Sequence, residues 1–212
     1  MTDNRRPISS RSTSWARSIA KRLSERNITP NQISVASIGF AALGALSLLY
    51  FKEYGGLILC ILFIQARLLC NLFDGMVAIE GQKKTASGPL FNEFPDRVAD
   101  SLLLIALGYA VFSPALGWLA ALLAFSTAYI RVFAGTLNIP QTFIGPMAKQ
   151  HRMAVMCIAC LIAQVEWSYN HSLYSLYLSL LVIIAGSALT CYNRTIYLLV
   201  ALKSQELPHD NI

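Results

Sequence analysis

Charged side chains are scarce in this chain of 212 residues. Only 13% of the residues are Asp, Glu, Lys or Arg, whereas 55% are hydrophobic and the mean hydropathy is +0.52. Because soluble domains carry about 25% charged residues, this composition excludes an ordinary water-soluble globule. It also excludes a disordered chain, which requires low hydrophobicity and high net charge. The scarcity of charge therefore predicts a membrane protein.

Histidine and cysteine are also few, and neither type forms a metal-binding or redox pattern. The three histidines, His151, His171 and His209, do not form a set of ligands. The five cysteines are odd in number and all lie in apolar stretches, which argues against a disulfide framework. Cys157 and Cys160 form a Cys-x-x-Cys motif without a second pair or a nearby histidine, so we expect them to be buried packing residues.

The first thirty residues are polar and basic. They lack the apolar stretch of a cleavable signal peptide, and we expect none. Seven of the seventeen Lys and Arg lie before residue 30, around Trp15, Ile19 and Leu23, which recur at four-residue spacing. This pattern is typical of an amphipathic helix that lies on a membrane surface and contacts anionic headgroups. The alternative is a solvated basic tail.

Six apolar runs follow this basic segment, separated by polar stretches or prolines. They cover approximately residues 31–51, 54–73, 95–112, 115–135, 153–166 and 172–202. A bilayer-spanning helix needs about 20 mostly apolar residues. The sequence therefore predicts an all-α, polytopic membrane protein with about six transmembrane helices after an N-terminal amphipathic surface helix. The expected organisation is a basic segment over 1–30, a six-helix catalytic domain over 31–203 and a polar tail over 204–212.

The distribution of Lys and Arg orients this bundle. With an even number of spans both termini lie on one side, and the loops of the opposite side contain only Lys52. The positive-inside rule then predicts that the termini and the two polar loops face the cytoplasm. Because the cations lie beside spans and not in an aromatic–basic patch on a soluble surface, we expect no binding of nucleic acid.

Acidic residues cluster at one end of two predicted spans. Five of the eleven Asp and Glu lie between residues 74 and 100, and carboxylates at membrane depth are costly and usually functional. Asn71 and Asp74 share one helix face, and Asp96 and Asp100 share another. Oxygen ligands on two helix ends favour a site for a hard divalent cation, which commonly shares them with substrate phosphates. The alternative is that these acids pair with neighbouring cations.

The residues around the cluster resemble the signature of the CDP-alcohol phosphotransferase (CDP-alcohol phosphatidyltransferase) family. That signature reads D-x-x-D-G-x-x-A-R, about eight residues, then G-x-x-x-D-x-x-x-D. The matching residues are Asp74-Gly75-x-x-Ala78, then Gly88, then Asp96-x-x-x-Asp100. Two further segments are similar to the start of the family's first span and to its basic loop: Thr29-Pro30-Asn31-Gln32-Ile33-Ser34 and Gly145-Pro146-x-x-Lys149-x-x-Arg152.

Two positions depart from the signature. Asn71 stands where the first aspartate is expected, and Ile79 stands where the arginine is expected. Glu80 and Glu93 are candidates to replace the lost negative charge, and Lys83 and Lys84 are the nearest candidates to replace the lost positive charge.

The last two aspartates of the signature fit this sequence in two registers. Counting without gaps gives Asn92 and Asp96, whereas one extra helical turn gives Asp96 and Asp100. Pro95 favours the second register, because proline suits the first turn of a helix. A helix that begins there would leave Asn92 in the loop and keep Asp96 and Asp100 together.

The resemblance implies a reaction. A CDP-linked alcohol, commonly CDP-diacylglycerol, would give its substituted phosphate to an acceptor alcohol in phospholipid synthesis, and CMP would leave. The resemblance also implies two divalent ions, Mg²⁺ or Mn²⁺, and suggests a homodimer.

The resemblance further implies roles for individual residues. The expected metal ligands are Asp74, Asp96, Asp100 and Asn71, with Asp96 and Asp100 as the catalytic carboxylates. The expected substrate-binding residues are Gly75, Ala78 and Gly88 for the cytidine diphosphate, and Lys149 and Arg152 for the phosphate of a phosphorylated acceptor.

Two other classes of function stay open. Asn71 and Ile79 motivate a membrane protein that keeps this fold without the chemistry. An ion or solute transporter fits less well, because transporters usually bind their substrates near the bilayer midplane, whereas these acids cluster at helix ends.

Overall fold

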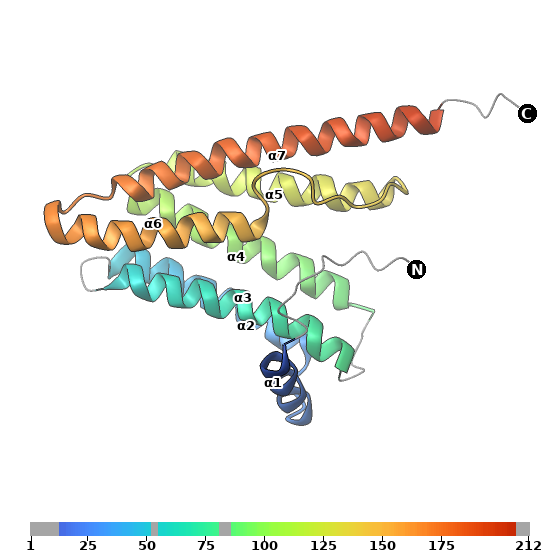
Figure 1. Ribbon diagram of the computed structural model, residues 1–212, viewed down its shortest axis with the longest axis horizontal. Helices are drawn as coiled ribbons and strands as arrows, with labels where there is room; N and C mark the ends of the chain where they lie inside the picture. Colours follow the sequence, from blue (N-terminus) through green and yellow to red (C-terminus); the bar gives the residue numbers. More distant parts are fainter. Residues whose placement is uncertain (1–12, 52–54, 81–85, 207–212) are drawn as a thin grey trace, which may run out of the picture.

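The computed structural model describes residues 13–51, 55–80 and 86–206, and these residues form seven helices and no strand. The helices are α1 (Ser14–Glu25), α2 (Pro30–Tyr50), α3 (Gly56–Glu80), α4 (Gly88–Ala110), α5 (Pro114–Thr136), α6 (Lys149–Asn170) and α7 (Tyr174–Glu206). In Figure 1, α2 to α7 run roughly along one axis as a bundle, and α1 lies against one end. The all-α prediction is confirmed.

The chain is an integral, multi-pass membrane protein. Five helices, α2, α3, α5, α6 and α7, are long and apolar enough to cross a bilayer. The third predicted span corresponds to α4, which is 23 residues long but carries four charged side chains within residues 93–100. Because α4 packs between α2 and α5 in the bundle, it has the position of a span, and the predicted count of six is approximate.

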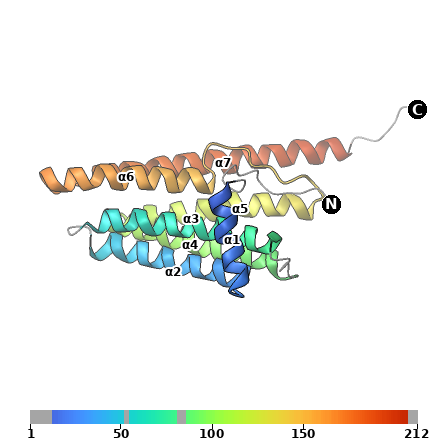
Figure 2. The ribbon, with the colours of Figure 1, turned by 60° about the horizontal axis from the view of Figure 1, so that its bottom comes forward.

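Helix α1 is the predicted amphipathic helix, and it crosses the bundle at a steep angle (Figure 2). Its fully buried residues are Ala16 and Ala20, which pack in one cluster with α3 side chains such as Met76. Trp15 and Ile19 are 48% and 39% exposed. Small alanines therefore bring α1 close to the bundle, while Trp15 packs edge-on against Phe73 of α3 with its ring centroid 6.2 Å away.

Helix α2 begins at the Thr29-Pro30 pair. The Thr29 hydroxyl accepts a hydrogen bond from the Gln32 backbone N–H at 3.3 Å, and the Gln32 side chain accepts one from the Thr29 N–H at 2.9 Å. This reciprocal capping box, with Pro30 in the first turn, satisfies donors that otherwise lack partners at a helix start. The motif is thus a strong local signal for the helix that carries Ser34 into the site.

Helix α4 begins seven residues earlier than the prediction from Pro95. It starts at Gly88, and Pro89 occupies the first turn, so Pro95 lies inside the helix and is buried. The sequence contains two prolines that could mark the start, and the expectation that Pro95 does so was wrong. Because α4 includes Asn92, this residue and Asp96 are four positions apart on one helical face.

The main hydrophobic core joins α2, α3, α4, α5, α6 and α7. All five cysteines are free, and Cys60, Cys157 and Cys160 are buried in this core, which agrees with their predicted packing role.

Glycines allow α4 and α5 to approach closely. A Cβ atom on Gly108 would lie 2.5 Å from the Cα of Gly117. We therefore expect Gly108→Val to lower the melting temperature of the detergent-purified protein, because overpacking costs about 1–3 kcal/mol. Gly39→Val is the matched control, since a Cβ at Gly39 meets no atom within 4 Å. Equal melting temperatures for the two variants would contradict the prediction.

Candidate functional site

A pocket of about 720 Å³ opens at the end of the bundle that α1 crosses, and each of the seven helices contributes a side chain to it. The predicted site residues that line it are Asn71, Asp74, Gly75, Ala78, Gly88, Asp96, Lys149 and Arg152. These residues come from α3, α4 and α6, which are far apart in sequence. The fold therefore brings together every predicted site residue except Asp100.

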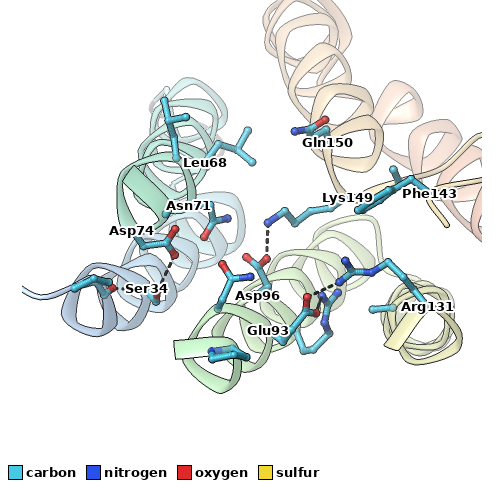
Figure 3. Close-up of a pocket in the computed structure, with 18 of the residues that line it drawn as sticks. Ser34, Leu68, Asn71, Asp74, Glu93, Asp96, Arg131, Phe143, Lys149 and Gln150 are labelled. Atoms are coloured by element: carbon cyan, nitrogen blue, oxygen red, sulfur yellow. Dashed lines mark hydrogen bonds and ion pairs between the residues drawn. The ribbon is translucent and has the colours of Figure 1, made fainter. Parts of the chain in front are cut away.

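Two carboxylates from different helices face this pocket (Figure 3). Asp74 of α3 and Asp96 of α4 are 4% and 8% exposed. The Ser34 hydroxyl donates a hydrogen bond to Oδ2 of Asp74 at 2.7 Å. Among the described residues, Oδ1 of Asp74 and Oδ1 of Asp96 are buried without a hydrogen-bond partner. Buried acceptors without partners are costly, so these two oxygens are available to a ligand.

Lys149 stands opposite the carboxylates at the start of α6. Its ammonium donates to Oδ2 of Asp96 at 2.5 Å, and the Lys149 side chain is 25% exposed. Figure 3 shows this side chain reaching across the pocket toward Asp96 and Asn71. The pair joins the end of α6 to α4 across the pocket.

Asp100 lies one helical turn after Asp96 on α4 and does not line the pocket. Its Oδ1 accepts from Arg67 at 2.5 Å and its Oδ2 accepts from Arg152 at 2.8 Å, and all three residues are at most 2% exposed. Each carboxylate oxygen of Asp100 therefore faces a guanidinium. We expected Asp100 to act as a metal ligand or a base, whereas this geometry is that of a buried ion triad.

Arg152, like Asp100, is held by partners within the protein. Besides Asp100, its guanidinium donates to the Met147 carbonyl at 3.0 Å and to the Thr127 hydroxyl at 3.4 Å. These bonds hold the end of the 137–148 connection against α4 and α5. The group expected to bind an acceptor phosphate thus already has three partners in the protein.

Asn92 lines the pocket together with Asp96. These two residues are the pair obtained when the signature is counted without gaps from Gly88. The geometry therefore favours the ungapped register, which the early start of α4 makes possible. In that register two of the four signature aspartates are amides here, Asn71 and Asn92.

The other side of the pocket is basic. Glu93 bridges Arg97 and Arg131, with N–O distances of 2.6 and 2.5 Å, and Arg131 also stands over the Phe143 ring at 5.4 Å from its centroid. Both carboxylate oxygens of Glu93 are thus paired with arginines. Glu93 therefore does not replace the negative charge that is missing at Asn71.

Arg194 of α7 has a different environment. It donates to the backbone carbonyls of Ile144, at 3.0 Å, and Thr127. Among the described residues it has no carboxylate within 4.0 Å. Its positive charge is therefore not neutralised by a nearby acid.

The pocket offers only a few protein ligands for a divalent cation. The described residues contain no group of three or more His, Cys, Asp or Glu side chains that could hold a metal ion. Asp74 and Asp96 nevertheless offer oxygens without partners, and Asn71 and Asn92 bring amide oxygens to the same pocket. Mg²⁺ is commonly bound by one or two carboxylates together with substrate phosphates, and these residues meet that requirement.

Several site residues were missed from the sequence. Ser34 lies in the segment that marked the start of α2, and Asn92 follows from the ungapped count, so both had a local signal. Arg67 shares a helix face with Asn71 and Asp74 and was a candidate cation for the acids, but no local signal chose Asp100, 33 positions away, as its partner. Lys83 and Lys84, the candidates to replace the missing arginine, and the Glu80 side chain lie outside the described residues. Ile79 is 51% exposed and does not line the pocket.

Comparison with known families decides which group of proteins shares this pocket. The model of the CDP-alcohol phosphatidyltransferase family matches residues 27–192, which include α2 to α6 and the first part of α7. The chain belongs to the CDP-alcohol phosphatidyltransferase family.

Relatives of this family member are known by sequence and by structure. The inner membrane protein YnbA of Escherichia coli (strain K12) is 26% identical over 158 residues, covering 73% of this chain and 79% of YnbA. Crystal structures of phosphatidylinositol phosphate synthase (PgsA1) from Mycobacterium tuberculosis share the fold. The structure with CDP-DAG bound has a TM-score of 0.74 at 16% identity and covers 88% of this chain and 94% of that one. The complex with manganese and citrate has a TM-score of 0.73 at 17% identity, with coverages of 87% and 88%.

Proposed function

We propose that this protein transfers a substituted phosphate group from a CDP-linked lipid alcohol, such as CDP-diacylglycerol, to the hydroxyl of an acceptor alcohol, with release of CMP. The observation that carries the proposal is the convergence of Asp74 and Asp96 from two helices on a pocket whose opposite side is basic. Family membership supports the reaction class, and the CDP-DAG complex of PgsA1 supports the type of donor.

The donor would bind against α3 and the start of α4. Gly75, Ala78 and Gly88 line that side of the pocket, and small residues allow a ligand to approach the backbone closely. Apolar side chains such as Leu68, Leu69 and Leu72 line the adjoining part. A diphosphate near the carboxylates and lipid chains beside the leucines would match these two surfaces.

A divalent cation fits this arrangement and would be held by Asp74 with oxygens from Asn71 and the donor diphosphate. When bound, such a cation neutralises the negative charge that develops during phosphoryl transfer. Ser34 orients Asp74 by its 2.7 Å hydrogen bond.

Asp96 is the residue we assign as the base. Its Oδ2 is held by Lys149, whereas Oδ1, 3.6 Å from the Arg67 guanidinium, has no hydrogen-bond partner. A base must lie within hydrogen-bond reach of the attacking hydroxyl, and Asp96 lines the pocket with this oxygen free of any hydrogen bond. Asp100 is a positioning residue, because both of its oxygens are bound to arginines.

The acceptor would enter from the basic side, and a phosphorylated alcohol fits it best. Lys149 and Arg194 line this side with Arg131, and Arg194 has no carboxylate partner among the described residues. Arg152 would act indirectly, by holding the connection before α6.

Arg194→Met is therefore expected to raise the KM for a phosphorylated acceptor about tenfold or more, because a charge-assisted contact is worth about 1.5–3 kcal/mol. The KM for CDP-diacylglycerol should stay within about twofold. Arg194→Lys should recover part of the loss, and the unchanged KM for the donor separates a lost acceptor contact from a general defect of the pocket. Steady-state kinetics with the acceptor varied would measure the split.

The test of the proposed function is CMP release by the purified protein in liposomes. The assay would supply CDP-diacylglycerol, a panel of phosphorylated and unphosphorylated acceptors, and Mg²⁺ or Mn²⁺, with EDTA as the metal-free arm. Glu25→Gln, an exposed carboxylate-to-amide change on α1, is the control variant. Metal-dependent release would establish the reaction. Absence of release with every acceptor would overturn it in favour of a non-catalytic member of this fold.

The orientation and assembly are part of the same proposal. The distribution of Lys and Arg supports a pocket and termini that face the cytoplasm, with the basic face of α1 on anionic headgroups. A homodimer stays a prediction from the resemblance.

A further inference from the structure

The two pocket carboxylates have unequal surroundings. Oδ2 of Asp96 contacts the Lys149 ammonium at 2.5 Å, and Oδ1 of Asp96 lies 3.6 Å from the guanidinium of Arg67. Two cations thus already face Asp96, one at each oxygen. A divalent ion bound at this carboxylate would be repelled by both of them.

Asp74 has no such neighbours. Among the described residues, no Lys, Arg or His group lies within 4.0 Å of its oxygens. Its Oδ2 accepts a hydrogen bond from Ser34, and its Oδ1 is buried without a partner. A buried carboxylate is normally paired with a cation or bound to a metal. Asp74 therefore lacks a counterion that Asp96 already has.

The other two signature positions cannot restore a second metal site. Asn71 and Asn92 provide oxygens without negative charge. A set of four aspartates would carry four negative charges. Here the two aspartates and the Lys149 ammonium together carry a net charge of −1. A site of this charge suits one divalent ion and disfavours two.

We propose that the pocket binds a single divalent cation, at Asp74, and that the Lys149 ammonium supplies at Asp96 the positive charge of a second ion. This inference rests on the proposed function only in treating the pocket as the site for the donor diphosphate. It differs from the family resemblance, which implies two ions.

The test is the number of Mn²⁺ ions that the purified full-length protein binds in detergent, counted by electron paramagnetic resonance during titration with Mn²⁺ alone. The wild type should bind one Mn²⁺ per chain, without the spin coupling of a close manganese pair. Asp74→Asn should bind none. Restoring the aspartates and removing the lysine, in Asn71→Asp/Asn92→Asp/Lys149→Met, should raise the count to two and produce spin coupling.

Three results would overturn the proposal: two Mn²⁺ per wild-type chain, none in the wild type, or one that survives Asp74→Asn and disappears in Asp96→Asn. Thermal unfolding of each variant would identify samples that have not folded, and Ser34→Ala offers a milder change at Asp74 that should weaken Mn²⁺ binding. CMP release measured on the same samples separates the two hypotheses. Release with two bound ions would overturn only this inference, whereas one bound ion without release would overturn only the proposed function.

Discussion

Asp96→Asn is expected to reduce CMP release by about 10²- to 10⁴-fold, the usual contribution of a general base. The substitution keeps the size of the side chain and one oxygen, but it removes the group that would accept the proton of the acceptor hydroxyl. The loss should fall on kcat, with a small effect on the KM of the donor. The measurement is the steady-state rate of CMP release in liposomes.

The fold of the Asp96→Asn variant should survive. Asp96 is buried, but its partner Lys149 is 25% exposed and can turn its ammonium toward water when the carboxylate is lost. The substitution therefore leaves no fully buried cation without its close partner, unlike the loss of Asp100. A melting temperature within a few degrees of the wild type would therefore accompany the lost activity. Full activity in this variant would exclude Asp96 as the base.

The sequence was informative wherever local chemistry determines structure. The Thr29–Ser34 segment indicates the start of α2, where the structure forms a capping box, and the apolar runs predict the bundle. Both depend on neighbours within a few residues or on composition alone. The positions of Asp74, Asp96 and Lys149 at one pocket also followed, since helix ends that share one side of a membrane lie close together.

The missing part of the site depends on contacts between distant segments. Pro89 and Pro95 are equally good local signals for a helix start, and only the packed structure shows that α4 begins at the first of them. The pairing of Asp100 with Arg67 and Arg152 joins positions 33 and 52 residues apart. No rule of sequence spacing connects Asp100 with these two arginines. The family signature therefore predicted a catalytic role for Asp100, whereas its partners make it part of the buried structure.

Asp100→Asn is expected to lower the stability of the protein by about 3–5 kcal/mol, because removing one partner of a buried ion pair leaves an uncompensated buried charge. The amide cannot neutralise Arg67 and Arg152, which are 0% and 1% exposed. A loss of this size corresponds to a drop in melting temperature of about 10 °C. Thermal unfolding in detergent, followed by tryptophan fluorescence, measures it, and Asp96→Asn is the control with the same chemical change on the same helix.

The pair of variants also decides between the two registers of the signature. If Asp96 is the base and Asp100 is structural, Asp96→Asn loses activity at nearly normal stability, whereas Asp100→Asn loses stability and, at temperatures where it stays folded, keeps measurable CMP release. The reverse pattern, an inactive Asp100→Asn that melts like the wild type, would assign the chemistry to Asp100. Because both aspartates lie on α4 and both substitutions are isosteric, the contrast reports the surroundings of each carboxylate and not the size of the replacement.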